Sequence, residues 1–140
     1  MRIVFDTNIL LSAMLSPNGV PAQVLAAWEE NRFTLAICPE LIAELREVSQ
    51  RPFFRARLHA GLAERLAASL RDLAISYRDL PSATGAPDRK DNFLLALAEA
   101  SQADFLVTGD KGLLSLKQHK STRIITPAAL VESLNAHGGE

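Results

Sequence analysis

Cysteine is almost absent from the sequence, and the one thiol, Cys38, has no partner for an intramolecular disulfide. Chains without disulfides are typical of reducing compartments, so we expect a cytoplasmic protein. The sequence also has no run of about 18 apolar residues, so no membrane-spanning helix is expected. Because Asp6 interrupts the first apolar residues, the start is too short for the apolar core of a signal peptide, and we expect no export.

A surplus of either charge is missing as well. The chain carries 15 Lys and Arg residues against 16 Asp and Glu residues, which leaves a formal net charge of −1. A protein that holds nucleic acid by general electrostatic attraction usually has a basic surplus, so the sequence argues against that class. It does not exclude an enzyme that contacts RNA at a local site.

The composition that remains is typical of one globular domain. Hydrophobic residues make up 48% of the 140 residues, so a core can form without disulfides or structural metals. No internal repeat, linker or low-complexity segment divides the chain. We expect a single domain over residues 1–136 and a frayed tail over residues 137–140.

Short apolar runs alternate with helical segments along the chain. This alternation is typical of parallel βαβ units, and nearly continuous apolar runs indicate a sheet that is covered on both faces. The sequence therefore predicts an α/β fold with a central, mainly parallel sheet of about five strands. The strands are expected at 3–5, 35–38, 73–77, 105–107 and 124–125, and the helices at 8–15, 21–31, 39–48, 53–72 (two helices divided at Gly61), 91–101, shortly after 110, and from 126 onward.

Two aspartates follow predicted strands. Asp6 comes directly after the first strand, and Asp110 follows the fourth after a short turn. Ligands of open parallel sheets bind beyond the carboxyl ends of the strands, so both are candidate site residues. Each could instead cap the next helix. For Asp110 the two interpretations weigh evenly, whereas Asp6-Thr7-Asn8 offers more polar groups than a cap needs.

Two further acids lie on predicted helices. Glu44 lies beside the apolar stripe of its helix, where it can face a shared cleft, whereas Glu40 and Glu47 point further toward solvent. Helix geometry alone favours a solvated position for Glu44. Asp91 begins a helix, where the helix dipole by itself would favour an acid, and Asp88 is a candidate cap nearby.

The four acids are more informative together than singly. Two carboxylates about 4 Å apart repel each other by about 4 kcal/mol at an effective dielectric near 20, so a cleft that gathers several needs protons or a cation. A hard divalent ion with oxygen ligands is the usual solution, and Mg²⁺ also keeps waters and binds substrate phosphate. Such a site activates a water for attack on a phosphodiester.

Four segments, in order, resemble the motifs of the PIN-domain family. Residues 3–8 are similar to its first strand with an Asp-x-Asn signature, and residues 39–45 to its second acidic motif. Residues 91–98 resemble the third motif and residues 106–111 the fourth, and the closing 124–127 also fits. The likeness covers nearly the whole chain and points to the bacterial branch related to VapC-type ribonucleases, the toxins of toxin–antitoxin pairs.

The resemblance implies a three-layer α/β/α fold and a Mg²⁺-dependent endoribonuclease, for which Mn²⁺ can substitute. Asp6, Asp91 and Asp110 would be catalytic and hold the metal directly or through water. Glu44 would be a further metal ligand or would orient the attacking water.

Supporting roles also follow from the resemblance. Asn8 and Thr108 would position the acids by hydrogen bonds, although ordinary turn chemistry explains these two residues equally well. Gly112 stands where many relatives of this branch have a further aspartate. This departure argues against a second metal site more than against the first.

The implied partners are an RNA substrate, a small antitoxin protein that covers the acidic cleft, and a second copy of the chain in a homodimer. Arg89 and Lys90 flank Asp91 and are the cations expected to meet the RNA backbone. The basic stretch around Arg51 is assigned to a solvated helix face instead. The histidines have no metal-ligand spacing and are expected at the surface: His59, His119 and His137.

Other function classes stay under consideration. An aspartate-based phosphatase usually has a second acid two positions after the first, where this chain has Asn8. A phosphoacceptor domain usually pairs two acids near the first strand, where only Asp6 is present. A catalytically inactive PIN-like module that binds RNA or protein would have no need of all four acids.

Overall fold

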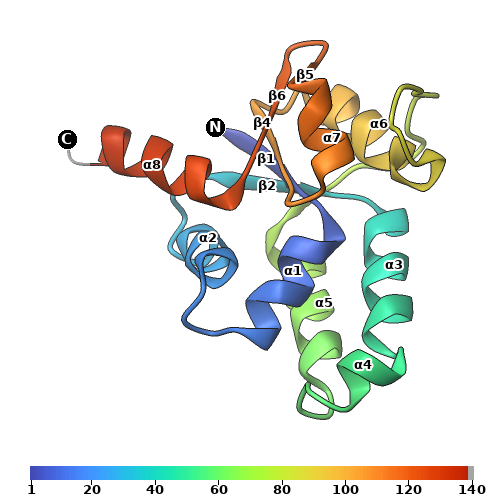
Figure 1. The fold of residues 1–140 in the computed structure, drawn as a ribbon, viewed down its shortest axis with the longest axis vertical. Helices are drawn as coiled ribbons and strands as arrows, with labels where there is room; N and C mark the ends of the chain where they lie inside the picture. The colour runs from blue at the N-terminus through green and yellow to red at the C-terminus, as the bar shows by residue number, and fades with distance from the viewer. Residues whose placement is uncertain (139–140) are drawn as a thin grey trace.

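A six-stranded sheet forms the centre of the computed structural model, which describes residues 1–138 (Figure 1). The strands lie in the order β3-β2-β1-β4-β6-β5, and neighbours run parallel except for the antiparallel β5–β6 pair. The predicted α/β fold with a mainly parallel sheet is therefore confirmed. In chain order the strands are β1 (Arg2–Phe5), β2 (Thr34–Ile37), β3 (Ile75–Ser76), β4 (Phe105–Val107), β5 (Gln118–His119) and β6 (Thr122–Ile125).

Helices cover the sheet on both sides. Figure 1 shows α6 and α7 on one side, and α1, α2, α3 and α5 on the other. Their bounds are α1 (Thr7–Leu15), α2 (Val20–Glu29), α3 (Pro39–Ser49), α4 (Pro52–Arg55), α5 (Leu62–Leu73), the 3₁₀ turn η1 (Arg89–Asp91), α6 (Asn92–Ser101), α7 (Lys111–Leu116) and α8 (Pro127–Gly138). No single helix of this part of the chain is long and apolar enough to cross a membrane, and the one pair that reaches the length together, α1 and α2, is bent by 103°.

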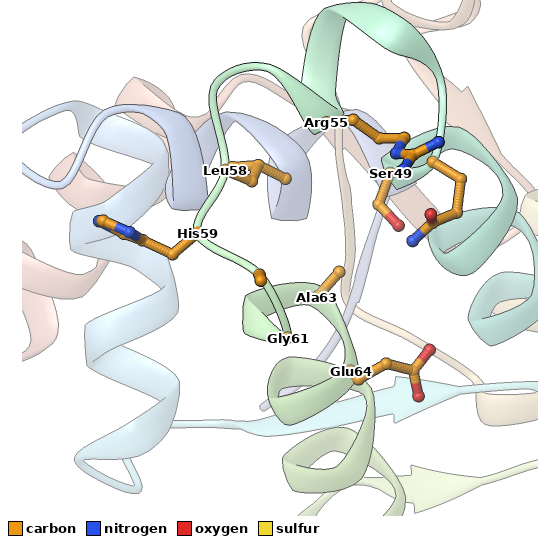
Figure 2. A pocket seen from close by; sticks show the side chains of 9 residues that line it. Ser49, Arg55, Leu58, His59, Gly61, Ala63 and Glu64 are labelled. Carbon is orange, nitrogen blue, oxygen red and sulfur yellow. The ribbon is translucent and has the colours of Figure 1, made fainter.

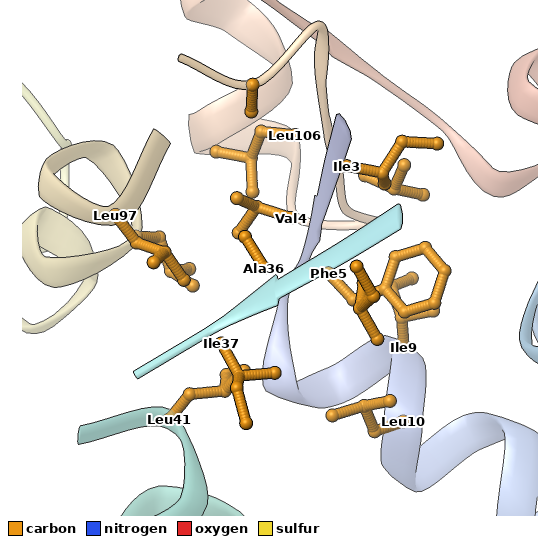
Figure 3. Packing of buried hydrophobic residues seen from close by; sticks show 14 of the residues in the cluster. Ile3, Val4, Phe5, Ile9, Leu10, Ala36, Ile37, Leu41, Leu97 and Leu106 are labelled. Carbon is orange, nitrogen blue, oxygen red and sulfur yellow. The ribbon is translucent and has the colours of Figure 1, made fainter. Parts of the chain in front are cut away.

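The central strand β1 explains why the sheet is buried on both faces. Ile3, Val4 and Phe5 have no solvent exposure, and successive side chains of a strand point to opposite faces. Figure 3 accordingly shows Val4 on the side of Leu97 from α6, and Phe5 on the side of Ile9 from α1. Because apolar layers cover both faces, the polar residues that follow the strands lie at the carboxyl ends of the strands, and we call this side the edge of the sheet when we describe the acids.

The structure differs from the predicted strands at both edges of the sheet. The strand expected at 73–77 is only two residues long, because α5 runs as far as Leu73, and both residues of β3 are exposed. The sixth strand, β5, was not predicted. Gln118 and His119 carry no apolar pattern, and they form a strand only by pairing with Arg123 and Thr122 of the next one.

The structure also bears on His119 and on the C-terminal end of the chain. His119 was expected at the surface, and this is wrong: its side chain is 15% exposed, and its Nε2 lies 2.6 Å from Glu99 Oε2. The pairing holds the β5–β6 hairpin against α6. The expected frayed tail begins inside α8, which runs to Gly138, and residues 139–140 lie outside the described residues.

Candidate active site

Asp6 and Asp110 are joined through a single hydroxyl group. Asp6 follows β1, and Thr108 follows the neighbouring parallel strand β4, so their side chains meet at the same edge of the sheet. The buried Thr108 Oγ1 donates to Asp6 Oδ2 at 2.7 Å and accepts a hydrogen bond from the backbone N–H of Asp110 at 3.0 Å. One side chain therefore sets the positions of two acids from different loops.

Both aspartates also cap helices. Asp6 Oδ1 accepts from the backbone N–H of Asn8 at 3.3 Å, at the start of α1. Asp110 Oδ2 accepts from the backbone N–H of Leu113 at 2.8 Å, at the start of α7. The capping interpretation is therefore confirmed for both side chains, and their role as site residues stays a prediction. A carboxylate oxygen has more than one lone pair, so a capping oxygen can still face a further ligand.

Glu44 is brought to the same edge by α3. Its Oε2 accepts a hydrogen bond of 3.0 Å from Thr7 Oγ1. Because Thr7 directly follows Asp6, this contact holds the Glu44 carboxylate near Asp6. The sequence marks residues 6–8 as a polar triplet, but it assigns no role to Thr7. The only sequence signal for this contact is a hydroxyl residue between two candidate site residues.

Asp91 precedes α6 and makes no capping hydrogen bond, whereas the nearby Asp88 accepts one from the backbone N–H of Lys90 at 3.0 Å. The Asp91 carboxylate is half-buried and free to face the other acids. Burial, which contributes most, and the carboxylates of Asp6, Asp88, Asp110 and Glu44, in that order, together raise its pKa to about 6. Asp91 therefore lies in the electrostatic field of all three other candidate acids.

The pKa values of two more acids rise for similar reasons. Burial raises the pKa of Asp6, and the Asp110 carboxylate adds to the shift, against the hydrogen bonds from Thr108 and Asn8. Burial also raises the pKa of Glu44, with a contribution from Asp6, although the Thr7 hydroxyl opposes it. Charge at one acid thus disfavours charge at its neighbours, which is the condition that a bound cation relieves.

The loop before η1 closes one side of the acids. The backbone N–H of Ala86 donates to Asn92 Oδ1 at 3.0 Å, which ties the loop to the start of α6. A Cβ at Gly112 would lie 3.0 Å from Asp110 Oδ2 and 3.3 Å from Pro87 Cβ. The space for a side chain at position 112 is therefore taken by Pro87, and glycine is the residue that fits.

The donor set can be tested against a divalent cation by its chemistry. Mg²⁺ prefers oxygen ligands, and the four acids offer only carboxylates, ranging from buried Asp6 to exposed Asp110. In the described part of the chain, however, no three Asp, Glu, His or Cys side chains converge closely enough to form a ready-made metal site. The ligand types fit a hard cation, and binding one requires some of the side chains to turn toward it.

The other predicted site residues, Asn8, Arg89 and Lys90, have fewer contacts with the four acids. The Asn8 side chain is exposed, and among the described contacts only its backbone reaches Asp6. Arg89 is exposed on η1. Lys90 lines a groove of about 400 Å³ that also borders Glu44, so of the two predicted cations it lies nearer to the acids.

A second cavity lies near the far end of α3. It has a volume of about 300 Å³, and Figure 2 shows Arg55, Leu58 and Glu64 around it. Glu64 is held there by Arg46, whose Nε lies 3.0 Å from Glu64 Oε1. None of the four candidate acids lines this cavity, so it is separate from the edge of the sheet where they gather.

Comparison with known proteins gives two findings. Residues 2–112 match the family described as PIN domain, and the match includes all four candidate acids. An uncharacterized protein of Methanocaldococcus jannaschii is 25% identical over 118 residues, which cover 84% of this chain and 76% of that protein. The name of this relative states no activity.

Proposed function

This chain belongs to the PIN-domain family, whose members are in general nucleases, and from this premise we propose that it is a Mg²⁺-dependent endoribonuclease. One observation carries the proposal. Four carboxylates from separate parts of the chain lie at the carboxyl ends of the strands, near enough that the charges of Asp6, Asp110 and Glu44 help burial to raise the pKa of Asp91 to about 6. Nucleases of this family typically use divalent metals, and such a set of acids offers the oxygen ligands that they need.

The chain's own residues would divide the work. Asp6, Asp91 and Asp110 would hold the cation, which when bound supplies an activated water and neutralises charge on the leaving oxygen. Thr108 keeps the Asp6 carboxylate facing Asp110 by its hydrogen bond of 2.7 Å. Glu44, held by Thr7, would accept a hydrogen bond from the attacking water and orient it toward the phosphate.

The test is cleavage of a mixed RNA pool by the purified protein in EDTA, Mg²⁺ or Mn²⁺. We expect metal-dependent cuts, and we expect Asp6→Asn to slow them by about 1000-fold because it removes a metal ligand. The folded state of the variant is checked by circular dichroism. Cleavage at the wild-type rate by Asp6→Asn would overturn the assignment of the site, and a folded wild-type protein that cuts no RNA with any metal would favour a binding module.

We further propose a cellular role, in which the protein acts in the cytoplasm as the toxin of a toxin–antitoxin pair. A small antitoxin protein would cover the acids, and the toxin would form a homodimer. The sequence resemblance to VapC-type ribonucleases supports this role. Induction in a bacterial host should arrest growth, Asp6→Asn should restore it, and light scattering should give twice the chain mass. Normal growth at high levels of active protein would contradict the toxin role.

A further inference from the structure

The groove beside Glu44 is separate from the acids that would hold the cation. It is lined by α3 on one hand and by η1 and the first turn of α6 on the other, and it has a volume of about 400 Å³. We propose that this groove binds one unpaired nucleotide of the RNA, next to the phosphate that is cleaved. The inference rests on the proposed nuclease function and deepens it. The residues that carry it are Glu40, Glu44 and Glu47 on α3, Arg51 just beyond that helix, and Lys90 and Phe93 on the opposite wall.

The position of the groove connects it to the reaction. Glu44 belongs both to the groove and to the group of acids, because its carboxylate is held by Thr7 next to Asp6. From Glu44 the groove follows α3 toward Arg51, about 10 Å further along at 1.5 Å per residue. A strand whose phosphate lies at the acids can therefore extend directly into the groove.

Two cations of the groove are available to phosphate. Among the described residues, the Lys90 ammonium forms no ion pair. The Arg51 guanidinium lies 3.8 Å from Glu47 Oε1, but the two side chains are 60% and 75% exposed, and such a pair contributes little. Either side chain can therefore bind a phosphate without losing a buried contact, since Lys90 gives up only solvent and Arg51 only an exposed ion pair.

The groove also offers a surface for a base. Phe93 lies on its wall and is half-buried, so its ring is held by packing while part of it faces the groove. Bases stack on aromatic rings with little regard to sequence, and this is the usual way in which proteins bind unpaired nucleotides. A base that is paired in a duplex cannot present its face to such a ring.

The acids on α3 decide how the nucleotide lies. Glu40 and Glu47 are exposed and, when ionised, can only accept hydrogen bonds, so they repel phosphate. They can accept from the N–H groups on the edge of a base. The phosphates are therefore expected at Lys90 and Arg51, with the edge of the base toward α3.

The proposal is tested by binding of a fluorescent unpaired oligoribonucleotide in Mg²⁺, with Asp6→Asn as the background so that nothing is cut. We expect Lys90→Ala and Arg51→Ala each to weaken binding about tenfold. Each should also make the fall of the log association constant with log salt concentration less steep by about 0.7. Arg123→Ala is the matched control, because Arg123 is an exposed cation near the opposite ends of the strands. Equal losses in all three variants, or none, would overturn the proposal.

The aromatic contact is tested separately. Phe93→Leu keeps an apolar side chain in the partly buried position, and we expect it to weaken binding about tenfold on every sequence, whereas Phe93→Tyr keeps the ring and should bind normally. A duplex that competes as well as the unpaired strand would contradict the proposal.

The outcomes separate this inference from the nuclease function. In active protein the Lys90 and Arg51 variants should raise KM with kcat within about twofold, since both act on binding alone. Metal-dependent cleavage with an unchanged KM in these variants would contradict the role of the groove in RNA binding and would still support the nuclease function. If the wild-type protein binds RNA but never cuts it, and these variants lose that binding, the groove proposal is supported and the nuclease function is contradicted.

Discussion

Thr108 is the residue on which the positions of two acids depend. Its hydroxyl is buried, and it links the carboxylate of Asp6 to the backbone of Asp110. Because Asp6 is only 5% exposed, water cannot fully replace this hydrogen bond. The contact serves folding and the arrangement of the site together, and a variant at this position should affect both.

Replacing Thr108 by Val removes the hydroxyl and keeps the shape. We expect a loss of about 1–3 kcal/mol in the free energy of unfolding, because the buried carboxylate of Asp6 loses its side-chain donor. Metal-dependent cleavage should fall by about 10–100-fold, the usual effect of a group that orients a metal ligand. Urea denaturation and initial cleavage rates measure the two effects. Thr108→Ser keeps the hydroxyl and should retain most of both properties; a Val variant with full activity would remove the positioning role.

The raised pKa of Asp91 leads us to expect that the stability of the metal-free protein depends on pH. Its pKa is raised from 3.8 to about 6 in the folded chain, so the folded state holds the proton more tightly between these values. The stability that it contributes is present at low pH and is lost as the pH rises through this range. At pH 7 the charged carboxylate is therefore a cost, which a neutral side chain would remove.

We expect Asp91→Asn in EDTA to melt about 3 °C higher than the wild type at pH 7 and equally at pH 3.5. Thermal melts across this pH range measure the difference. Glu132→Gln on α8 is the control, because Glu132 is an exposed acid on another helix. A lower melting temperature for Asp91→Asn at pH 7 would mean that the charged carboxylate makes a stabilising contact instead.

At the scale of elements, the contact between the loop before η1 and the start of α7 sets the distance between two acids. Asp91 follows the loop that contains Pro87, and Asp110 precedes the helix that contains Gly112. Pro87 occupies the space beside Gly112, and Asn92 holds the adjacent Ala86. The two chain segments can approach only because position 112 has no side chain.

Replacing Gly112 by Ala should therefore lower metal-dependent cleavage by about tenfold, as a displacement of Asp110 or Pro87 alters the ligand set. The melting temperature should change little, because alanine is the better helix former and offsets part of the steric cost. Gly109→Ala is the matched control, since a Cβ there meets nothing within 4 Å. If both variants cleave RNA at the wild-type rate, the contact has no part in positioning the acids.

At the scale of the whole molecule, a cation at the acids should bind the folded chain and not the unfolded one. Mg²⁺ at about 100 times its Kd should then add about 2.7 kcal/mol to the free energy of unfolding. Thermal melts against Mg²⁺ concentration measure this gain. Asp110→Asn keeps a capping oxygen but removes a charge, so its melting temperature should respond much less to Mg²⁺. An equal response in the variant would place the cation elsewhere.

Much of the fold could be predicted because it depends on local patterns. Apolar runs of strand length, separated by helical segments, indicate a parallel sheet wherever they occur, and both Asp6 and Asp110 directly follow such runs or their turns. The strand β5 could not be predicted, because Gln118 and His119 have no strand pattern of their own. Their conformation comes from pairing with β6 and from the contact of His119 with Glu99.

The sequence by itself determined the alternation of strands and helices and the acids that stand at their ends, since these follow from hydrophobic periodicity along the chain. Only the tertiary structure decided which side chains meet. Thr7 and Glu44 are 37 positions apart, and Thr108 and Asp6 are 102 apart, so no local pattern records their contacts. The order of the strands creates them, because it places the ends of β1 and β4 side by side and lays α3 next to α1.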